Sequence, residues 1–129
     1  TNTITVPAGK GIVILGADEN AQINRADGFA GDLFAVNGAL YMAKKDATET
    51  ESAGTLSVDG SVGDSTQVAG SLIHVAAGAK FSMTTGIKLI NNTTSASGAA
   101  VFNEGGIVQI TGGTITGIKV PFTALVPSL

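Results

Sequence analysis

The residues that could do chemistry in this sequence are ten acids, seven Lys or Arg residues and one His. Two carboxylates beside a basic group could cleave a glycosidic bond, provided that rigid elements hold them on either side of it. The best trio of this kind is Asp59, Asp64 and Lys88, yet almost every acid falls in a predicted corner or loop, where Asp forms turns and Glu is solvated. The sequence therefore predicts no catalytic residue and no enzyme. The acids are Asp18, Glu19, Asp27, Asp32, Asp46, Glu49, Glu51, Asp59, Asp64 and Glu104.

The single histidine and the glycine pairs do not indicate a metal or cofactor site. Alternation places His74 on the opposite face of its strand from Ile73 and Val75, so its ring points outward as that of an ordinary surface residue. Without a Cys or a second His nearby, it predicts no metal site. The strings Gly9-Lys10-Gly11 and Gly105-Gly106 lack the GK[ST] sequence and the following helix of a phosphate loop, so we interpret them as corners. No metal and no cofactor are expected.

The pair Asn91-Asn92 is interpreted as a stacked corner whose side-chain amides bond the backbone. The strings Asn91-Asn92-Thr93 and Asn92-Thr93-Thr94 also match the acceptor pattern for N-glycosylation. That match matters only in a secretory context that supports it.

The composition indicates one ordered domain made of short strands. Hydrophobic residues make up 43% of the 129 residues and charged residues 13%, so the chain is not of the disordered class. With 18 Gly but only 3 Pro, it is not collagen-like either, and its glycines suit tight corners between β-branched strands. The absence of Cys excludes a disulfide framework.

Charge and hydropathy argue against two classes of partner. The net charge is −3 and no Lys/Arg cluster exceeds Lys44-Lys45, so the sequence predicts no nucleic-acid footprint. No apolar run approaches the ~18 residues of a membrane span. A signal-peptide pattern is also absent from these residues.

The elements that must position these residues repeat along the chain. From Gly98 to Gly117, three β-favouring runs alternate with Gly-bearing corners, which is the pattern of one solenoid coil. Similar coils of about 28 residues precede it, and the second is lengthened by polar insertions at 43–54 and 61–70. We predict strands at 3–6, 12–15, 21–24, 33–36, 39–42, 55–58, 72–75, 80–83, 87–90, 99–102, 107–110 and 114–116.

Alignment of the coils predicts the columns of core side chains. Strands this short bury too little to be stable alone, so each is expected to pair in parallel with its equivalent in the next coil, at about 4.8 Å. One predicted column contains Val6, Val36, Val75 and Val101. Val13 and Leu15 are aligned with Leu40 and Met42, with Phe81 and Met83, and with Val108 and Ile110.

The strings IHVAAGAKFSMTTGIKLINN and VFNEGGIVQITGGTITG resemble the degenerate repeats of right-handed parallel β-helix proteins. The resemblance is closest to the pectin-lyase-like modules of bacterial adhesins and autotransporter passengers, and it runs from Ile4 to about Val120. It implies an all-β, right-handed parallel β-helix of about four coils, in a single domain over 1–129, at the cell surface or outside the cell. The same fold hosts adhesins, fibres, lyases and hydrolases, so the resemblance leaves the function open.

Two features of the sequence suggest self-association. Leu33, Leu72 and Phe102 are expected at the same outward position as His74, where either the insertion at 43–54 or another subunit covers them. The tail at 121–129 is apolar, and it either caps its own helix or reaches a neighbour. The tail residues expected in a subunit contact are Pro121, Phe122, Leu125, Val126 and Leu129.

These expectations favour a non-enzymatic extracellular structural module, either a segment of a cell-surface adhesin or a subunit of a self-assembling fibre. The expected partner is another copy of the chain or a glycan on a host surface. The alternative is a β-helix that binds or cleaves carbohydrate on an outer sheet.

Overall fold

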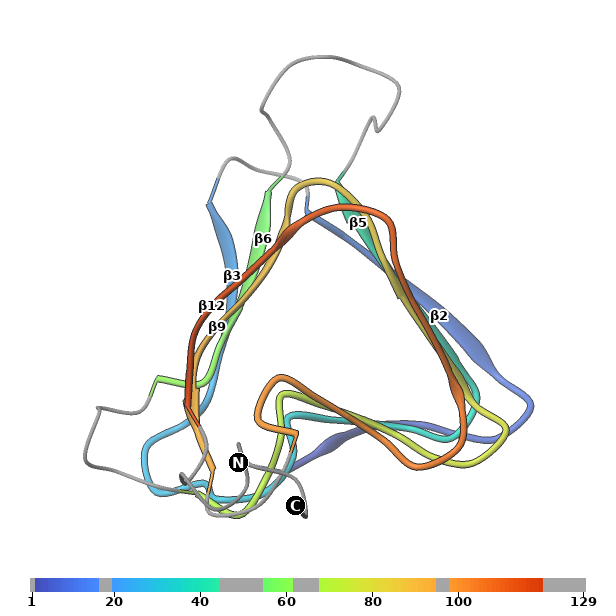
Figure 1. Ribbon diagram of the computed structural model, residues 1–129, viewed down its shortest axis with the longest axis horizontal. Coiled ribbons are helices and arrows are strands. Elements are labelled where there is room, and N and C mark those ends of the chain that lie inside the picture. Colours follow the sequence, from blue (N-terminus) through green and yellow to red (C-terminus); the bar gives the residue numbers. More distant parts are fainter. Residues whose placement is uncertain (1, 17–19, 45–54, 62–67, 95–97, 120–129) are drawn as a thin grey trace, which may run out of the picture.

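The protein, described here from a computed structural model, is an all-β, right-handed parallel β-helix of about four coils. The structure describes residues 2–16, 20–44, 55–61, 68–94 and 98–119. Seen along the helix axis, the coils superpose as a three-sided prism (Figure 1). The described part of the chain contains no helix that could span a membrane.

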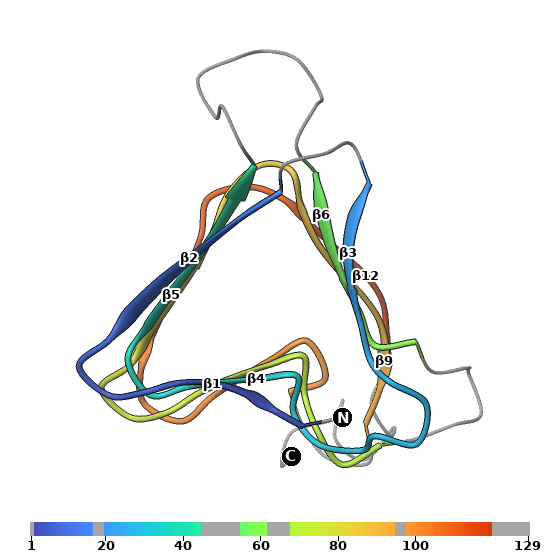
Figure 2. The ribbon, with the colours of Figure 1, turned by 180° about the vertical axis from the view of Figure 1, so that it is seen from behind.

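Each side of the prism is a four-stranded parallel sheet that takes one strand from every coil. Sheet A contains β1 (Ile4–Val6), β4 (Phe34–Val36), β7 (Ile73–Val75) and β10 (Val101–Asn103). Sheet B contains β2 (Gly11–Gly16), β5 (Ala39–Lys44), β8 (Lys80–Met83) and β11 (Ile107–Ile110). Sheet C contains β3 (Ala21–Asn24), β6 (Leu56–Asp59), β9 (Ile87–Thr93) and β12 (Thr114–Lys119). Seen from behind, β1 and β2 belong to the front coil (Figure 2).

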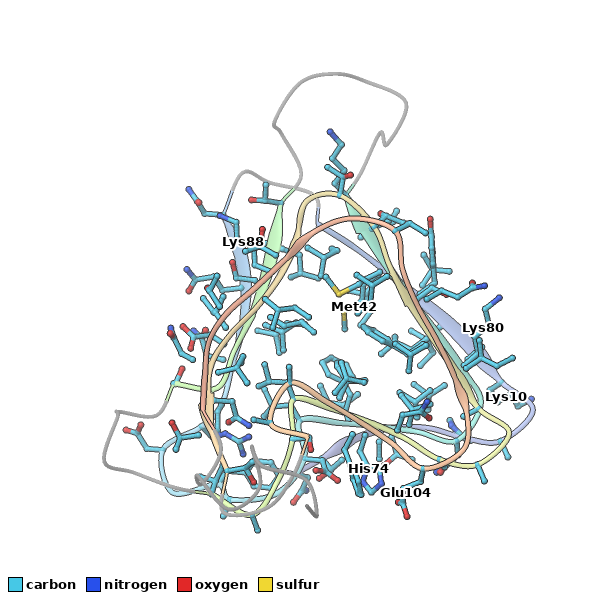
Figure 3. The ribbon with its side chains drawn as sticks, viewed as in Figure 1. Lys10, Met42, His74, Lys80, Lys88 and Glu104 are labelled. Atoms are coloured by element: carbon cyan, nitrogen blue, oxygen red, sulfur yellow. The ribbon has the colours of Figure 1, made fainter. Side chains whose placement is uncertain are left out.

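The core is a set of inward columns, because alternation sends every second side chain of each short strand into the prism. Figure 3 shows Met42 inside the prism, with Lys10 and Lys80 outside it. Side chains in the middle coils, such as Phe34, Phe81 and Leu89, are fully buried. Four columns run through all coils: Ile4, Phe34, Ile73 and Val101; Ile12, Leu40, Phe81 and Val108; Ile14, Met42, Met83 and Ile110; Ile23, Val58, Leu89 and Ile115.

Two of the predicted alignments are wrong at the terminal coils. Val75 pairs with Asn103, and Val101 pairs instead with Ile73. In the first coil, Val13 pairs with Tyr41 on the outer face, so the predicted alignment of Val13 and Leu15 with the core column is shifted by one residue. The run from Ile12 to Leu15 is apolar at every position and therefore lacks the alternation that fixes which face is inward.

The expected insertions are only partly covered by the described residues. β5 continues through Ala43 and Lys44, which were expected to begin the first insertion. Val68 forms a parallel bridge with Thr94, so the end of the second expected insertion joins the stack beside sheet C. Residues 45–54, 62–67 and 121–129 lie outside the described residues.

The corner between sheets C and A is filled by a buried polar network. The Arg25 guanidinium donates to the carbonyls of Phe29 and Gly31 and, at 3.0 Å, to Oδ1 of Asn92. Asn92 has no exposed surface, and its amide nitrogen donates to the carbonyls of Gly70 and Ala99. Burial lowers the pKa of Arg25, against a smaller opposing effect of the Asp32 charge.

This network confirms the predicted bonding between a side-chain amide and the backbone at Asn92, but the interpretation of Asn91-Asn92 as a corner is wrong, because both residues lie within β9. It also makes Asn92 unsuitable as a glycosylation acceptor, since its side chain is fully enclosed. The neighbouring Asn91 is exposed and adopts a φ of 59°, a left-handed conformation that Asn tolerates better than most residues.

We predict that Asn92→Ala lowers the free energy of unfolding by about 3 kcal/mol, because it removes the acceptor of one Arg25 amino group and the donors to the Gly70 and Ala99 carbonyls in the interior. Asn24→Ala is the matched control, since Asn24 is exposed and its amide makes only a 3.4 Å bond to Gln22. The control should change stability by less than about 0.5 kcal/mol. Denaturant unfolding of the three proteins measures both values, and equal effects would contradict the structural role of the network.

Candidate functional site

The outer face of sheet A carries a cluster of one histidine and two carboxylates. Asp32 precedes β4, His74 is the middle residue of β7, and Glu104 follows β10. His74 Nδ1 lies 2.8 Å from Asp32 Oδ2, and its Nε2 contacts Glu104 Oε1. Figure 3 shows His74 and Glu104 side by side outside the prism. The cluster therefore joins the second, third and fourth coils.

Neighbouring groups hold each member of this cluster in place. The second oxygen of Asp32 accepts a hydrogen bond of 2.7 Å from the backbone N–H of Ser71. The ring of Phe102, the residue opposite His74 in β10, lies 4.9 Å from the imidazole between centroids. The Glu104 backbone N–H donates to the Val75 carbonyl at 2.8 Å. The cluster is thus fixed by the sheet and its corner.

The charges around His74 favour the imidazolium form. Partial burial of the ring lowers its pKa, but the hydrogen bonds to Asp32 and Glu104 and their negative charges outweigh that effect, so the pKa lies above its ordinary value. A neutral imidazole has one N–H and one lone pair, so it can donate to only one carboxylate while its lone pair faces the other. Only the protonated ring can donate a hydrogen bond to both carboxylates.

The cluster acts as a staple between coils rather than as a poised base. Both ring nitrogens already contact carboxylates, so neither is free to take a proton from a substrate while the cluster is intact. The prediction that His74 points outward is confirmed, but the prediction that it is an ordinary surface residue is wrong. A signal for the contact was present, because Glu104 follows His74 by 30 residues, close to one coil.

The trio considered for catalysis does not assemble from the described residues. Asp59 Oδ1 accepts a hydrogen bond from the Ser61 backbone N–H, as turn-forming Asp does. Lys88 is paired in register with Ser57, and Asp64 lies outside the described ranges. Among the residues that the structure describes, no group of three or more His, Cys, Asp or Glu is placed to hold a metal ion.

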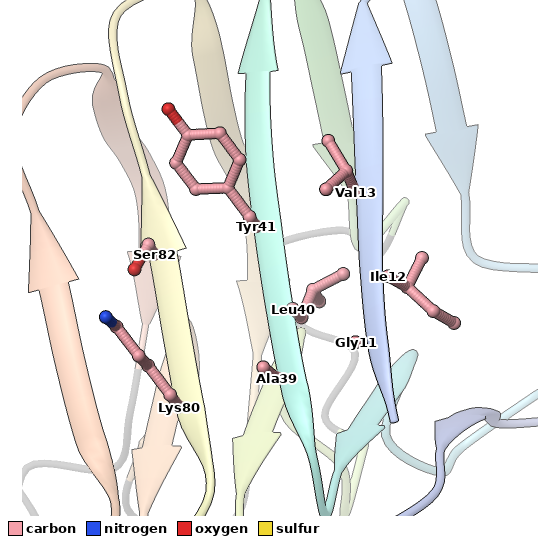
Figure 4. A pocket seen from close by; sticks show the side chains of 8 residues that line it. All are labelled: Gly11, Ile12, Val13, Ala39, Leu40, Tyr41, Lys80 and Ser82. Atoms are coloured by element: carbon pink, nitrogen blue, oxygen red, sulfur yellow. The ribbon is translucent and has the colours of Figure 1, made fainter. Parts of the chain in front are cut away.

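The outer face of sheet B forms a shallow apolar trough. A hollow of about 340 Å³ lies where Gly11 and Ala39 leave room beside larger side chains. In Figure 4, Tyr41, Ser82 and Lys80 line one side of this hollow. The complete lining is Gly11, Ile12, Val13, Ala39, Leu40, Tyr41, Lys80 and Ser82. A second hollow, of about 440 Å³, shares Gly11, Ala39 and Lys80 with the first and extends the trough to Lys10 at the corner.

This trough occupies a different face from the predicted apolar patch. Leu33 and Leu72 are buried, so their expected exposure beside His74 is wrong. β4 and β7 begin one residue later, at Phe34 and Ile73, and the alternation that exposes His74 does not extend into the corner before them. Phe102 is exposed as expected. The expected tail contacts, Pro121, Phe122, Leu125, Val126 and Leu129, lie outside the described residues.

The two ends of the prism form a third candidate surface. No described strand pairs with the outer edges of β1, β2 and β3, or with those of β10, β11 and β12. Four of the isoleucines that complete the core columns are consequently exposed there. Their exposed fractions are 46% for Ile4, 37% for Ile12, 47% for Ile110 and 42% for Ile115.

Comparisons of this chain with protein-family models, curated proteins and solved structures give no match.

We predict that stability falls as the pH rises, because the folded-state pKa of His74 lies above its ordinary value of 6.5. The contribution is complete below that ordinary value and is lost as the pH rises through the raised pKa. The expected loss in the free energy of unfolding is on the order of 1 kcal/mol, since the cluster is partly solvated.

His74 is the only histidine, so His74→Gln should remove this slope from urea unfolding curves measured between about pH 6 and pH 9. Equal slopes in the two proteins would show that the staple does not depend on protonation.

Proposed function

We propose that this chain is a non-enzymatic structural module of an extracellular or cell-surface protein, either a β-helical segment of an adhesin or a subunit of a self-assembling fibre. The observation that supports this most directly is the pair of open ends. In both terminal coils, the outer strand edges pair with no described strand and several core isoleucines are partly exposed, and bare parallel edges recruit further strands. The proposed partner is therefore another copy of the same chain.

The walls of the prism fit a load-bearing role. Every described strand pairs in register with a neighbouring coil, and the columns between them are filled by fully buried aliphatic and aromatic side chains in the middle coils. The His74 staple also joins three coils from outside. In a stack of this kind the stability of each coil depends on its contacts with its neighbours, so the coils are held together along the whole axis. The resemblance to bacterial surface proteins supports an extracellular location for such a module.

A second candidate function, carbohydrate binding, is favoured by the trough on sheet B. Tyr41 offers an exposed ring, and Lys80 and Ser82 place a cation and a hydroxyl beside it. Aromatic faces and a few convergent polar groups are what sugar and other small-ligand sites use. The hollow is shallow, so the expected ligand is a glycan that lies across the surface of sheet B rather than one enclosed in a cavity.

We predict that the purified chain forms concentration-dependent oligomers or filaments, because its terminal edges can pair with other copies. Sedimentation velocity and negative-stain electron microscopy measure this directly. A protein that stays monomeric at high concentration would contradict self-assembly. Unchanged assembly after removal of residues 121–129 would exclude a role of the tail as the assembly arm.

For the trough, we expect Tyr41→Ala to weaken retention on a glycan array by up to about tenfold, since one stacked ring contributes ~0.5–1.5 kcal/mol. Val13→Ala, on the same face, should have a smaller effect because it removes no ring. If wild type binds no glycan, the carbohydrate function is wrong.

A further inference from the structure

We infer that the partner of this chain is a second copy stacked head to tail, with β1, β2 and β3 of one copy continuing β10, β11 and β12 of the other. This inference deepens the proposed self-association, on which it rests, by assigning the surfaces and the strand register. It follows from the charges on the edges, from the side chains that line them and from the direction of the strands.

The terminal strands lack the charges that normally protect a sheet edge. β1, β2 and β3 contain no charged residue, and neither do β10 and β11. The six terminal strands contain one charge, Lys119, at the end of β12. Natural edge strands are usually blocked by Lys, Pro or a bulge, so these edges are suited to pairing with another chain.

The side chains lining the two ends complete each other. The middle coils fill the columns with large residues such as Phe81, Leu40 and Met83, whereas the end residues of the four columns are all Ile or Val. In the four columns, continuing the observed register places apolar, β-branched side chains over one another, and such side chains pack well between parallel strands. The resulting inward pairs are Ile4 on Val101, Ile12 on Val108, Ile14 on Ile110 and Ile23 on Ile115.

The outward positions in this register are compatible as well. No like charges meet, because the paired residues are uncharged. They are Thr5 on Phe102, Val13 on Gln109, Gln22 on Thr114 and Asn24 on Thr116. The one inward mismatch places Val6 on Asn103, whose side chain is already bonded to the backbone of Gly106. The contact would therefore leave no new polar group unpaired at that position.

Strand direction selects head-to-tail stacking over the symmetric alternatives. All strands within the helix are parallel, and only head-to-tail contact keeps them parallel across the junction. Two identical ends meeting face to face would place the strands antiparallel and break the columns. Head-to-tail contact uses two different surfaces of the same chain, and because each copy continues the prism along its axis, the assembly does not close into a ring and produces a filament.

The absence of Cys from the chain makes the register testable by cross-linking. Val13 and Gln109 are exposed in the same outward column of sheet B, in the first and the last coil of one prism. Three strand spacings separate them, or about 14 Å, which is too far for a disulfide within the chain. Stacked copies would bring the two positions onto adjacent strands, within disulfide reach.

We expect the double variant Val13→Cys/Gln109→Cys to give a ladder of disulfide-linked dimers, trimers and longer species under mild oxidation. The matched control Gln22→Cys/Gln109→Cys places its thiols on sheets C and B and should remain unlinked. Non-reducing electrophoresis of both proteins measures the disulfide-linked species. An equal ladder from the control would overturn the inferred register.

Single variants test the orientation. Val13→Cys alone should stay monomeric on the gel, and its conversion to disulfide-linked dimers would show two first coils meeting, which would overturn the head-to-tail arrangement. Filaments in the wild type together with no ladder from the double variant would overturn the register while leaving self-assembly intact. If the wild type is monomeric and assembles only after removal of residues 121–129, the chain's own tail covers the last coil. That result would overturn the inference.

A second measurement does not depend on cysteine. Ile12→Lys places a charge on one end and Ile110→Lys places one on the other, so each variant keeps a single functional end. Each alone should lose filaments, and an equimolar mixture should form dimers by sedimentation velocity. Unfolding curves confirm that both variants are folded. Filaments formed by either folded variant alone would contradict stacking through these columns.

Discussion

Each strand of this protein obtains its backbone hydrogen bonds from the neighbouring coil. Strands of three to seven residues bury too little to form alone, so every coil is stable only against the next one. This dependence explains the in-register sheets, the inward columns and the tight glycine corners. It also explains why the ends differ from the middle, since a terminal coil has a partner on one side only among the described strands.

Apolar columns alone do not specify which coil pairs with which. Ile, Val and Leu at successive levels are nearly interchangeable, so a shift along the axis would cost little in the columns. Two polar features remove this ambiguity. Arg25 reaches Asn92 across 67 residues in the buried corner, and His74 joins Asp32 to Glu104 on the outer face. Each requires particular coils to lie together, a use of polar groups known from other repetitive folds.

The surfaces of the prism consequently have different characters. Sheet A carries a proton-dependent staple, sheet B carries an apolar trough beside Tyr41 and Lys80, and the ends expose the core columns. The trough reaches the end of the prism through Gly11, Ile12 and Val13 of β2, so the sheet B surface and the first-coil end adjoin each other.

The sequence by itself determined the repeat, the parallel β-helix of about four coils and most strand positions, because glycine corners and β-branched runs are local signals. It also determined that His74 points outward. The tertiary structure decided what the local pattern left ambiguous: that Val13 faces outward and that Leu33 and Leu72 are buried. It alone brought Asp32 and Glu104 to His74, because contacts across 42 and 30 residues depend on how the coils stack rather than on any neighbouring residue.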